Sequence, residues 1–358
     1  MPGDAASDLV PRQTAPFNAE TPMRALAEPI TPTRRFYVRS HFDVPALEPE
    51  AWRLRLGGAV ARPEVLSLAH LRGLPPARGV VTLECAGNGR TALAPRPSGV
   101  PWAYGAVGTA EFAGASLAAL LERAGLAADA REVLFVGADA GEVRPGRREA
   151  FRRSLPLEAA RHPDTLLAWE MNGEPLTPAH GAPLRLVVPG WYGMASVKWL
   201  VGIEVLREPF TGWYQRREYV YAGPGDLPDG EPDLRGAEPV TRIRVRSVFA
   251  APEDGETLPP GPIDLAGSAW SGGGAIRRVE VSWDGGRTWS EAAVRAPRSP
   301  HGAATWRLRW SPPRPGAYTL MVRAEDTSGA VQPLEPVWNR LGYGNNGVHR
   351  IRVTLRGA

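Results

Sequence analysis

The sequence has almost no cysteine, because Cys85 is the only one in 358 residues. A single thiol cannot form an intramolecular disulfide, so a fold held together by disulfide bonds is excluded. Long apolar runs are also missing, and no stretch approaches the roughly eighteen apolar residues of a membrane span. The opening MPGDAASDLV lacks the pattern of a secretory signal. We expect a cytoplasmic protein, or a periplasmic one if a leader was removed.

A strong charge of one sign is absent as well. Lys and Arg number 42 against 38 Asp and Glu, so the formal net charge is only +4. No run of Lys and Arg with interleaved aromatic residues occurs, which argues against a nucleic-acid partner. This composition remains compatible with a local basic pocket that binds a small anion.

Glycine and proline are abundant, at 40 and 37 residues, which favours turns and short strands over long helices. Residues 1–35 predict an extended arm, and the Gly, Pro and acid-rich segment 222–240 predicts a linker. We therefore expect two domains, 1–235 and 236–358. The first is predicted to be α+β, and the second, with seven or so short strands, an immunoglobulin-like sandwich.

Local patterns place the expected elements of the first domain. Ser67 and Ser116 are predicted to cap helices, and Asn172-Gly173 is a strong hairpin signal. Strands are expected from alternation or apolar runs at 35–40, 51–58, 80–85, 131–139, 166–171, 184–190 and 197–206.

Cys85 ends an apolar strand and opens the loop AGNGR, which contains Gly87 and Gly89. Glycine lets a backbone turn tightly and approach a ligand closely, and loops at strand ends often carry binding groups. A thiolate is a soft metal ligand, and Arg90 nearby favours the thiolate form. A lone cysteine can equally be a small buried apolar residue.

Several separated motifs resemble those of the sulfite oxidase family, in one consistent order over roughly residues 15–356. They are FYVRSHFDVP at 36–45, LECAGNGR at 83–90, MNGEPLTPAHGAPLRLVVPG at 171–190, VKWL at 197–200, WYQRREY at 213–219, SAWSGGG at 268–274 and VWNRLGYGNNGVHRIRV at 337–353. The resemblance implies a molybdopterin-binding catalytic domain followed by a dimerisation domain, hence a homodimer. It also implies that Cys85 binds molybdenum.

The resemblance also implies which side chains hold the molybdenum–pterin cofactor. The matching positions are Tyr37, Val38, Arg39, Ser40, His41, Asp139, His180, Arg185, Ser196, Val197 and Lys198. Arg185 and Lys198 suit the pterin phosphate, because a planar guanidinium and a compact ammonium both bind phosphate well. Ser40 and Ser196 stand where known members have Asn and His.

For the substrate, the resemblance implies oxidation of sulfite to sulfate by oxygen-atom transfer. Arg39 and Arg90 match the arginines that hold the anion, and Tyr219 matches a tyrosine that points at the reacting oxygen. Trp102 resembles a pocket-wall residue, with core packing an equal alternative. No haem or flavin motif occurs, so we expect the electrons to pass to a separate acceptor such as a cytochrome c.

One departure and several alternatives accompany this interpretation. In several family members an arginine of the second domain, two residues after the Trp-Asn pair, enters the pocket, whereas here Arg340 follows Asn339 directly. Two alternatives remain: a reductase of nitrate or a sulfoxide with the same cofactor, and an immunoglobulin-like binding protein without catalysis. Metal analysis of the purified protein would distinguish the binding protein from the enzyme. SWDGGRTW at 282–289 matches a sialidase Asp-box, but a propeller needs several, so a hairpin turn is predicted.

Overall fold

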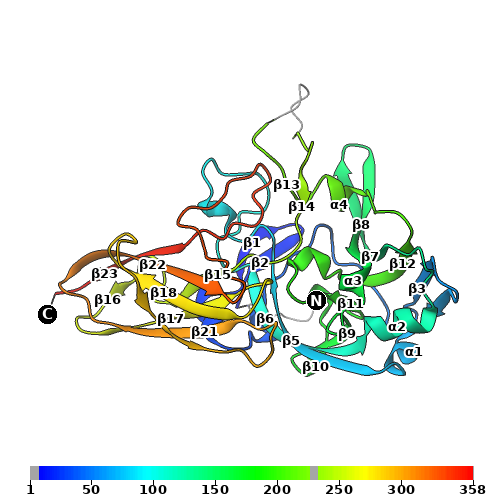
Figure 1. The fold of residues 1–358 in the computed structure, drawn as a ribbon, viewed down its shortest axis with the longest axis horizontal. Coiled ribbons are helices and arrows are strands. Elements are labelled where there is room, and N and C mark those ends of the chain that lie inside the picture. The colour runs from blue at the N-terminus through cyan, green and yellow to red at the C-terminus, as the bar shows by residue number, and fades with distance from the viewer. Residues whose placement is uncertain (1–7, 226–232, 358) are drawn as a thin grey trace.

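The computed structural model describes residues 8–225 and 233–357, and strands dominate it (Figure 1). Helices in this described part are short, the longest α-helix having eight residues. The α-helices are α1 (Leu68–Arg72), α2 (Leu117–Ala124), α3 (Leu157–Ala160) and α4 (Trp213–Arg216), and the 3-10 helices are η1 (Met23–Ala27), η2 (Thr33–Arg35), η3 (Arg90–Ala92), η4 (Pro178–His180) and η5 (Gly193–Ala195). The first half is thus mostly strand with few helices.

Two five-stranded sheets form the first half. One has the order β10-β9-β6-β5 with β11 beside β9, and the other has the order β4-β3-β12-β7-β8. Their strands are β3 (Leu54–Gly58), β4 (Glu64–Leu66), β5 (Pro76–Glu84), β6 (Val107–Ser116), β7 (Glu132–Arg144), β8 (Arg147–Pro156), β9 (Leu166–Met171), β10 (Glu174–Pro175), β11 (Arg185–Val187) and β12 (Leu200–Leu206). Helix α2 buries Leu117, Leu120 and Leu121 in the core that these sheets share.

The second half is built from two further sheets, of orders β15-β17-β21-β20 and β16-β23-β22-β18-β19, which enclose a single apolar cluster. Their strands are β15 (Arg246–Ala251), β16 (Thr257–Leu258), β17 (Ile263–Trp270), β18 (Ile276–Ser282), β19 (Ser290–Glu291), β20 (Ala293–Arg295), β21 (Ala304–Trp310), β22 (Gly316–Asp326) and β23 (His349–Leu355). The 282–289 segment is a turn in which Asp284 accepts hydrogen bonds from Thr288. This confirms the predicted turn.

The N-terminal segment connects the two halves. It forms a hairpin of β1 (Val10–Thr14) and β2 (Phe17–Glu20), which Figure 1 shows between the halves, instead of a fully irregular arm. Ser268 in β17 donates a hydrogen bond to the carbonyl of Leu26, and Arg24 pairs with Glu256 at 2.8 Å. The segment is therefore fixed against the second half.

Part of the predicted linker, residues 226–232, lies outside the described residues, as do residues 1–7. On either side of it, β13 (Val220–Tyr221) pairs with β14 (Glu238–Pro239). The domain boundary between residues 235 and 236 stays a prediction.

Candidate functional site

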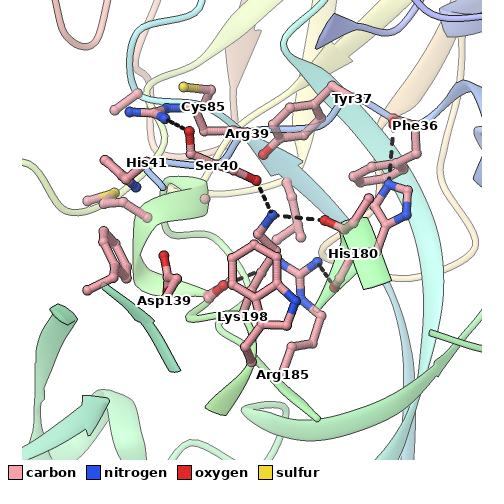
Figure 2. A pocket seen from close by; sticks show the side chains of 18 of the residues that line it. Phe36, Tyr37, Arg39, Ser40, His41, Cys85, Asp139, His180, Arg185 and Lys198 are labelled. Carbon is pink, nitrogen blue, oxygen red and sulfur yellow. Dashed lines mark hydrogen bonds between the residues drawn. The ribbon is translucent and has the colours of Figure 1, made fainter. Parts of the chain in front are cut away.

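A cavity lies where loops from separated parts of the first half meet the end of β5. Figure 2 shows Cys85, Arg39 and Ser40 at one side of it and Lys198, Arg185 and His180 at the other. The predicted site residues that line it are Tyr37, Arg39, Ser40, His41, Cys85, Asp139, His180, Arg185, Ser196, Lys198 and Tyr219.

Cys85 follows β5 directly, and its backbone N–H donates to the carbonyl of Ala106 at 2.9 Å. Gly89, with φ of 82°, takes the left-handed conformation that turns the loop back. Burial raises the pKa of the Cys85 thiol, and Arg39, the backbone N–H of Gly87 and then Arg90 oppose that shift. The sulfur therefore keeps its proton until a cation displaces it.

Arg39 brings a positive charge to the same side of the cavity as Cys85. One of its Nη atoms donates to the carbonyl of Ser40. Burial lowers the pKa of Arg39, but Tyr219 and Cys85 raise it, and the net shift is upward. The guanidinium thus stays charged beside the thiol.

Arg90, predicted to hold the anion with Arg39, is not among the side chains that line the cavity. Its Nη atoms donate to the carbonyls of Val100 (2.9 Å) and Leu341 (3.1 Å), and its guanidinium lies 5.3 Å from the ring centre of Tyr343. The structure places Arg90 behind the cysteine loop, where it ties that loop to the second half.

The other side of the cavity is cationic. Lys198 donates to Ser40 Oγ at 3.1 Å and to the carbonyl of Ala179 at 2.8 Å. Arg185 donates to the carbonyls of His180 and Ser196. Burial, then Arg185, lowers the pKa of Lys198, and Asp139 opposes the shift. These cations favour an anionic ligand.

Asp139 is the one carboxylate among the described residues that line the cavity. Burial raises its pKa to about 6, while Lys198 opposes the rise. Its Oδ1 and the Nε of Arg185 are buried without a hydrogen-bond partner. Buried polar atoms rarely stay unpaired in a native protein, so both fit a polar ligand in the cavity.

His180 is fixed in a neutral form. Its Nδ1 lies 2.8 Å from Thr177 Oγ1 and its Nε2 lies 3.3 Å from the carbonyl of Phe36. Burial, helped by Lys198 and Arg185, lowers its pKa to about 3. Both nitrogens of this neutral ring are thus engaged by neighbouring residues of the protein.

Three predicted residues contribute little side-chain chemistry to the cavity. Ser196 Oγ accepts a hydrogen bond from the N–H of Val188 at 3.0 Å. Val38 pairs through its backbone with Ala19, and the carbonyl of Val197 accepts from the N–H of Leu186. Neither valine lines the cavity.

Tyr219 has an unusual backbone, with φ of 42°, which a bulky residue rarely adopts. Its ring stacks on Tyr343 with centres 5.0 Å apart, and its hydroxyl lies 2.7 Å from Nε2 of His41. Strained residues that the surrounding structure holds in place cluster at functional sites.

The second half contributes no described side chain to the cavity lining, but it supports the strand end that carries Cys85. Buried Glu84, next to Cys85, pairs with Arg246 at 2.8 Å and accepts from Trp270 Nε1 at 2.8 Å. The motif SAWSGGG contains Trp270, and the motif VWNRLGYGNNG contains Tyr343, so both motifs marked the region.

Further contacts fix the cysteine loop from the second half. The N–H of Gly344 donates to the carbonyl of Ala86, and Asn345 Nδ2 donates to the carbonyl of Gly89. Arg340 is not among the side chains that line the cavity, and its N–H donates to the carbonyl of Ala222.

Among the described residues, no three His, Cys, Asp or Glu side chains gather into a metal site. Every helix in the described ranges is too short or too polar to cross a bilayer.

Two protein-family models match this chain. Residues 41–214 match the oxidoreductase molybdopterin binding domain, and residues 237–356 match the Mo-co oxidoreductase dimerisation domain. Sulfite oxidase of Gallus gallus is 40% identical over 352 residues, which is 94% of this chain and 75% of that protein.

Mitochondrial sulfite oxidase of Rattus norvegicus is 38% identical over 358 residues, 95% of this chain. The chain spans only 64% of the length of that relative. The crystal structure of the sulfane dehydrogenase SoxCD from Paracoccus pantotrophus has a TM-score of 0.81 and 28% identity, over 97% of this chain and 88% of that one.

Proposed function

This chain belongs to the sulfite oxidase family of molybdopterin-binding oxidoreductases, and on that premise we propose that it oxidises sulfite to sulfate. The observation that carries the proposal is the cavity itself, where the Cys85 thiol and the Arg39 guanidinium lie at one side of a cation-rich pocket. Sulfite is a small anion, so a charged guanidinium beside the reacting centre suits it.

The cavity fits the cofactor that defines the family. Cys85 would bind the molybdenum, because a thiolate is a suitable soft ligand. Lys198 and Arg185 would hold the phosphate, and Asp139 would hydrogen-bond the pterin. His180 lines the cavity with both ring nitrogens engaged by Thr177 and Phe36, so it would contact the cofactor without a hydrogen bond from its ring. The unpaired Asp139 Oδ1 and Arg185 Nε supply the polar capacity that such a group would satisfy. When bound, the cofactor supplies the redox change and the transferred oxygen.

In this proposal, the side chains of the protein bind sulfite and orient the reacting groups. Sulfite and water yield sulfate, two protons and two electrons, and the electrons pass to a separate acceptor such as a cytochrome c. Arg39 would hold the sulfite oxygens by charge-assisted hydrogen bonds. The hydroxyl of Tyr219 would bind an oxygen at the reacting centre. For Arg90 we propose an indirect role, since it positions the cysteine loop.

For the second half we propose an immunoglobulin-like sandwich that forms a two-fold homodimer. Its two sheets around one apolar cluster, and its match to a dimerisation domain, support this. We place the domain boundary between residues 235 and 236 and propose a cytoplasmic location, or a periplasmic one if a leader is removed.

A steady-state assay of the molybdenum-loaded protein tests the proposed function. Sulfite with ferricyanide or cytochrome c is compared with thiosulfate as a sulfane-sulfur compound, because the SoxCD structure resembles this one. Nitrate and a sulfoxide are offered with a reduced dye. Turnover of sulfite alone is the expected result. Preference for thiosulfate, or turnover only in the reductive assays, would reject sulfite as the substrate.

A further inference from the structure

His41 and Tyr219 come from distant parts of the chain, yet they meet at the cavity. The Tyr219 hydroxyl and Nε2 of His41 are 2.7 Å apart, a short hydrogen bond for this pair of atoms. Both side chains line the cavity. A direct contact between two polar side chains at a reacting centre calls for a functional explanation.

Both rings are held by their neighbours. The imidazole of His41 stacks on Phe151 with centres 4.6 Å apart and meets the edge of Tyr214 at 4.9 Å. Tyr219 is stacked between Tyr343 and the guanidinium of Arg153, which lies 5.7 Å from its ring centre. The hydrogen bond is therefore part of a fixed aromatic cluster, defined as His41, Phe151, Tyr214, Tyr219 and Tyr343.

The surroundings decide which group donates. Burial lowers the pKa of His41 well below its usual value, and Arg39 and Lys198 add to that shift. Burial raises the pKa of Tyr219 far above its usual range, with Arg39 opposing it. A neutral imidazole then faces a protonated phenol. The phenol is the better donor and the imidazole nitrogen the better acceptor, so the O–H donates to Nε2.

We infer that His41 is a positioning residue, which accepts the only proton of Tyr219 and turns the lone pairs of the phenolic oxygen toward the cavity. Tyr219 then acts in the cavity as a hydrogen-bond acceptor. The ligand it binds must be a donor, namely water or hydrogensulfite. The inference rests on the proposed function and departs from the resemblance, which gives His41 to the cofactor.

A double-mutant cycle tests the coupling. His41→Ala and Tyr219→Phe should each lower kcat by about tenfold or more, the size found when an orienting partner is lost. Because His41 acts through the hydroxyl, His41→Ala should cost nothing further in the Tyr219→Phe background. His41→Gln, whose amide oxygen can accept the same proton, should recover part of the loss. Independent, multiplying losses would overturn the inference.

Two readouts do not depend on turnover. Nitrogen-15 NMR of the imidazoles should show His41 protonated on Nδ1, and this signal should change in Tyr219→Phe. Molybdenum content should match the wild type in His41→Ala, with His162→Gln, an exposed histidine away from the cavity, as the control. An Nε2-protonated His41, or loss of molybdenum in His41→Ala, would overturn the inference. If the wild type does not turn over sulfite, only the proposed function is rejected. The NMR result would still test the hydrogen bond between Tyr219 and His41.

Discussion

At the scale of single residues, the thiol of Cys85 gives the sharpest test. Cys85→Ser replaces the soft sulfur with a hydroxyl that does not ionise at neutral pH, in a buried position of the same shape. We expect molybdenum and sulfite oxidation to be lost while the fold survives. Metal analysis and thermal unfolding measure the two effects. A variant that keeps its metal and its full turnover would remove Cys85 as the ligand.

The charge of Arg39 leads to a prediction about substrate binding. Arg39→Gln keeps hydrogen-bonding capacity but removes the charge beside Cys85. Charge-assisted hydrogen bonds contribute about 1.5–3 kcal/mol, so the KM for sulfite should rise by roughly tenfold or more. Arg55→Gln, an exposed change on β3, is the matched control. Equal KM values in the two variants would exclude Arg39 from the substrate site.

His349 makes stability depend on pH. Burial, with Arg246, lowers its pKa from 6.5 to about 3, and its Nδ1 accepts from the N–H of Phe249 at 3.0 Å. Between those values the unfolded chain binds a proton that the folded protein does not. The contribution of neutral His349 to the free energy of unfolding is therefore complete above pH 6.5 and is lost as the pH falls toward 3.

His349→Gln should reduce this acid sensitivity, since an amide has no proton to gain. Urea unfolding at several pH values measures the slope, and the loss between neutral and acid pH should be smaller in the variant. Some slope should persist, because the pKa of His180 is lowered in the same way. An unchanged slope would show that His349 contributes nothing to it.

The resemblance of the motifs to the sulfite oxidase family predicted most of the cavity lining but not the contacts within it. Lys198 lies inside the matched motif VKWL, and Asp139 is a charged residue at the end of the predicted strand 131–139, so the sequence marks both. Arg90 is also inside a motif, yet it lies behind the loop because its Nη groups bind backbone carbonyls of Val100 and Leu341. Such partners depend on chain segments that only the fold brings together.

At the scale of elements, the cysteine loop is tightly packed at Gly87. A Cβ there would lie 2.7 Å from Nη2 of Arg90 and 2.8 Å from its Cζ. Gly87→Ala should displace the Arg90 guanidinium from the carbonyl of Leu341 and destabilise the fold by about 1–3 kcal/mol, as overpacking does.

Gly57→Ala is the matched control for the loop, because nothing lies within 4 Å of its added Cβ. Denaturant midpoints of the two variants measure the difference. A loss of stability that is equal in both would mean that the loop can relax around the methyl group. Then Arg90 would have no fixed place behind the cysteine.

The sequence predicts the two capped helices correctly, but it misses strand β8 and wrongly predicts a strand at 35–40. Ser67 and Ser116 cap α1 and α2 as the sequence indicates, because their side chains accept from N–H groups three residues later. Strand β8 was missed, because its arginines hide the alternation. Segment 35–40 alternates like a strand, but it is not one, and its only bridge joins Val38 to Ala19.

At the scale of the whole molecule, the second half fixes the loop that carries Cys85. Glu84 is fully buried, and its carboxylate is bound by Arg246, Trp270 and Asn88. Burial raises the pKa of Glu84, and Arg246 opposes the rise most strongly. The ion pair with Arg246 and the hydrogen bond from Trp270 thus link the residue before Cys85 to β15 and β17 of the second half.

Arg246→Met tests this link between the halves. It leaves the Glu84 carboxylate buried without its cation, which typically costs about 3–5 kcal/mol. The pKa of Glu84 should rise further, so its protonation at low pH should relieve part of the loss. Urea unfolding should therefore show a larger deficit at pH 8 than at pH 5, relative to the wild type at each pH.

Glu84→Gln combined with Arg246→Met removes both charges and keeps an acceptor for Trp270. If the buried charge is what destabilises Arg246→Met, this double variant should be the more stable of the two, although it carries one more substitution. It should still hold molybdenum less well than the wild type, because nothing ties the carbonyl of Asn88 to the second half through Arg246. A double variant less stable than Arg246→Met would mean that shape, rather than charge, joins the two halves.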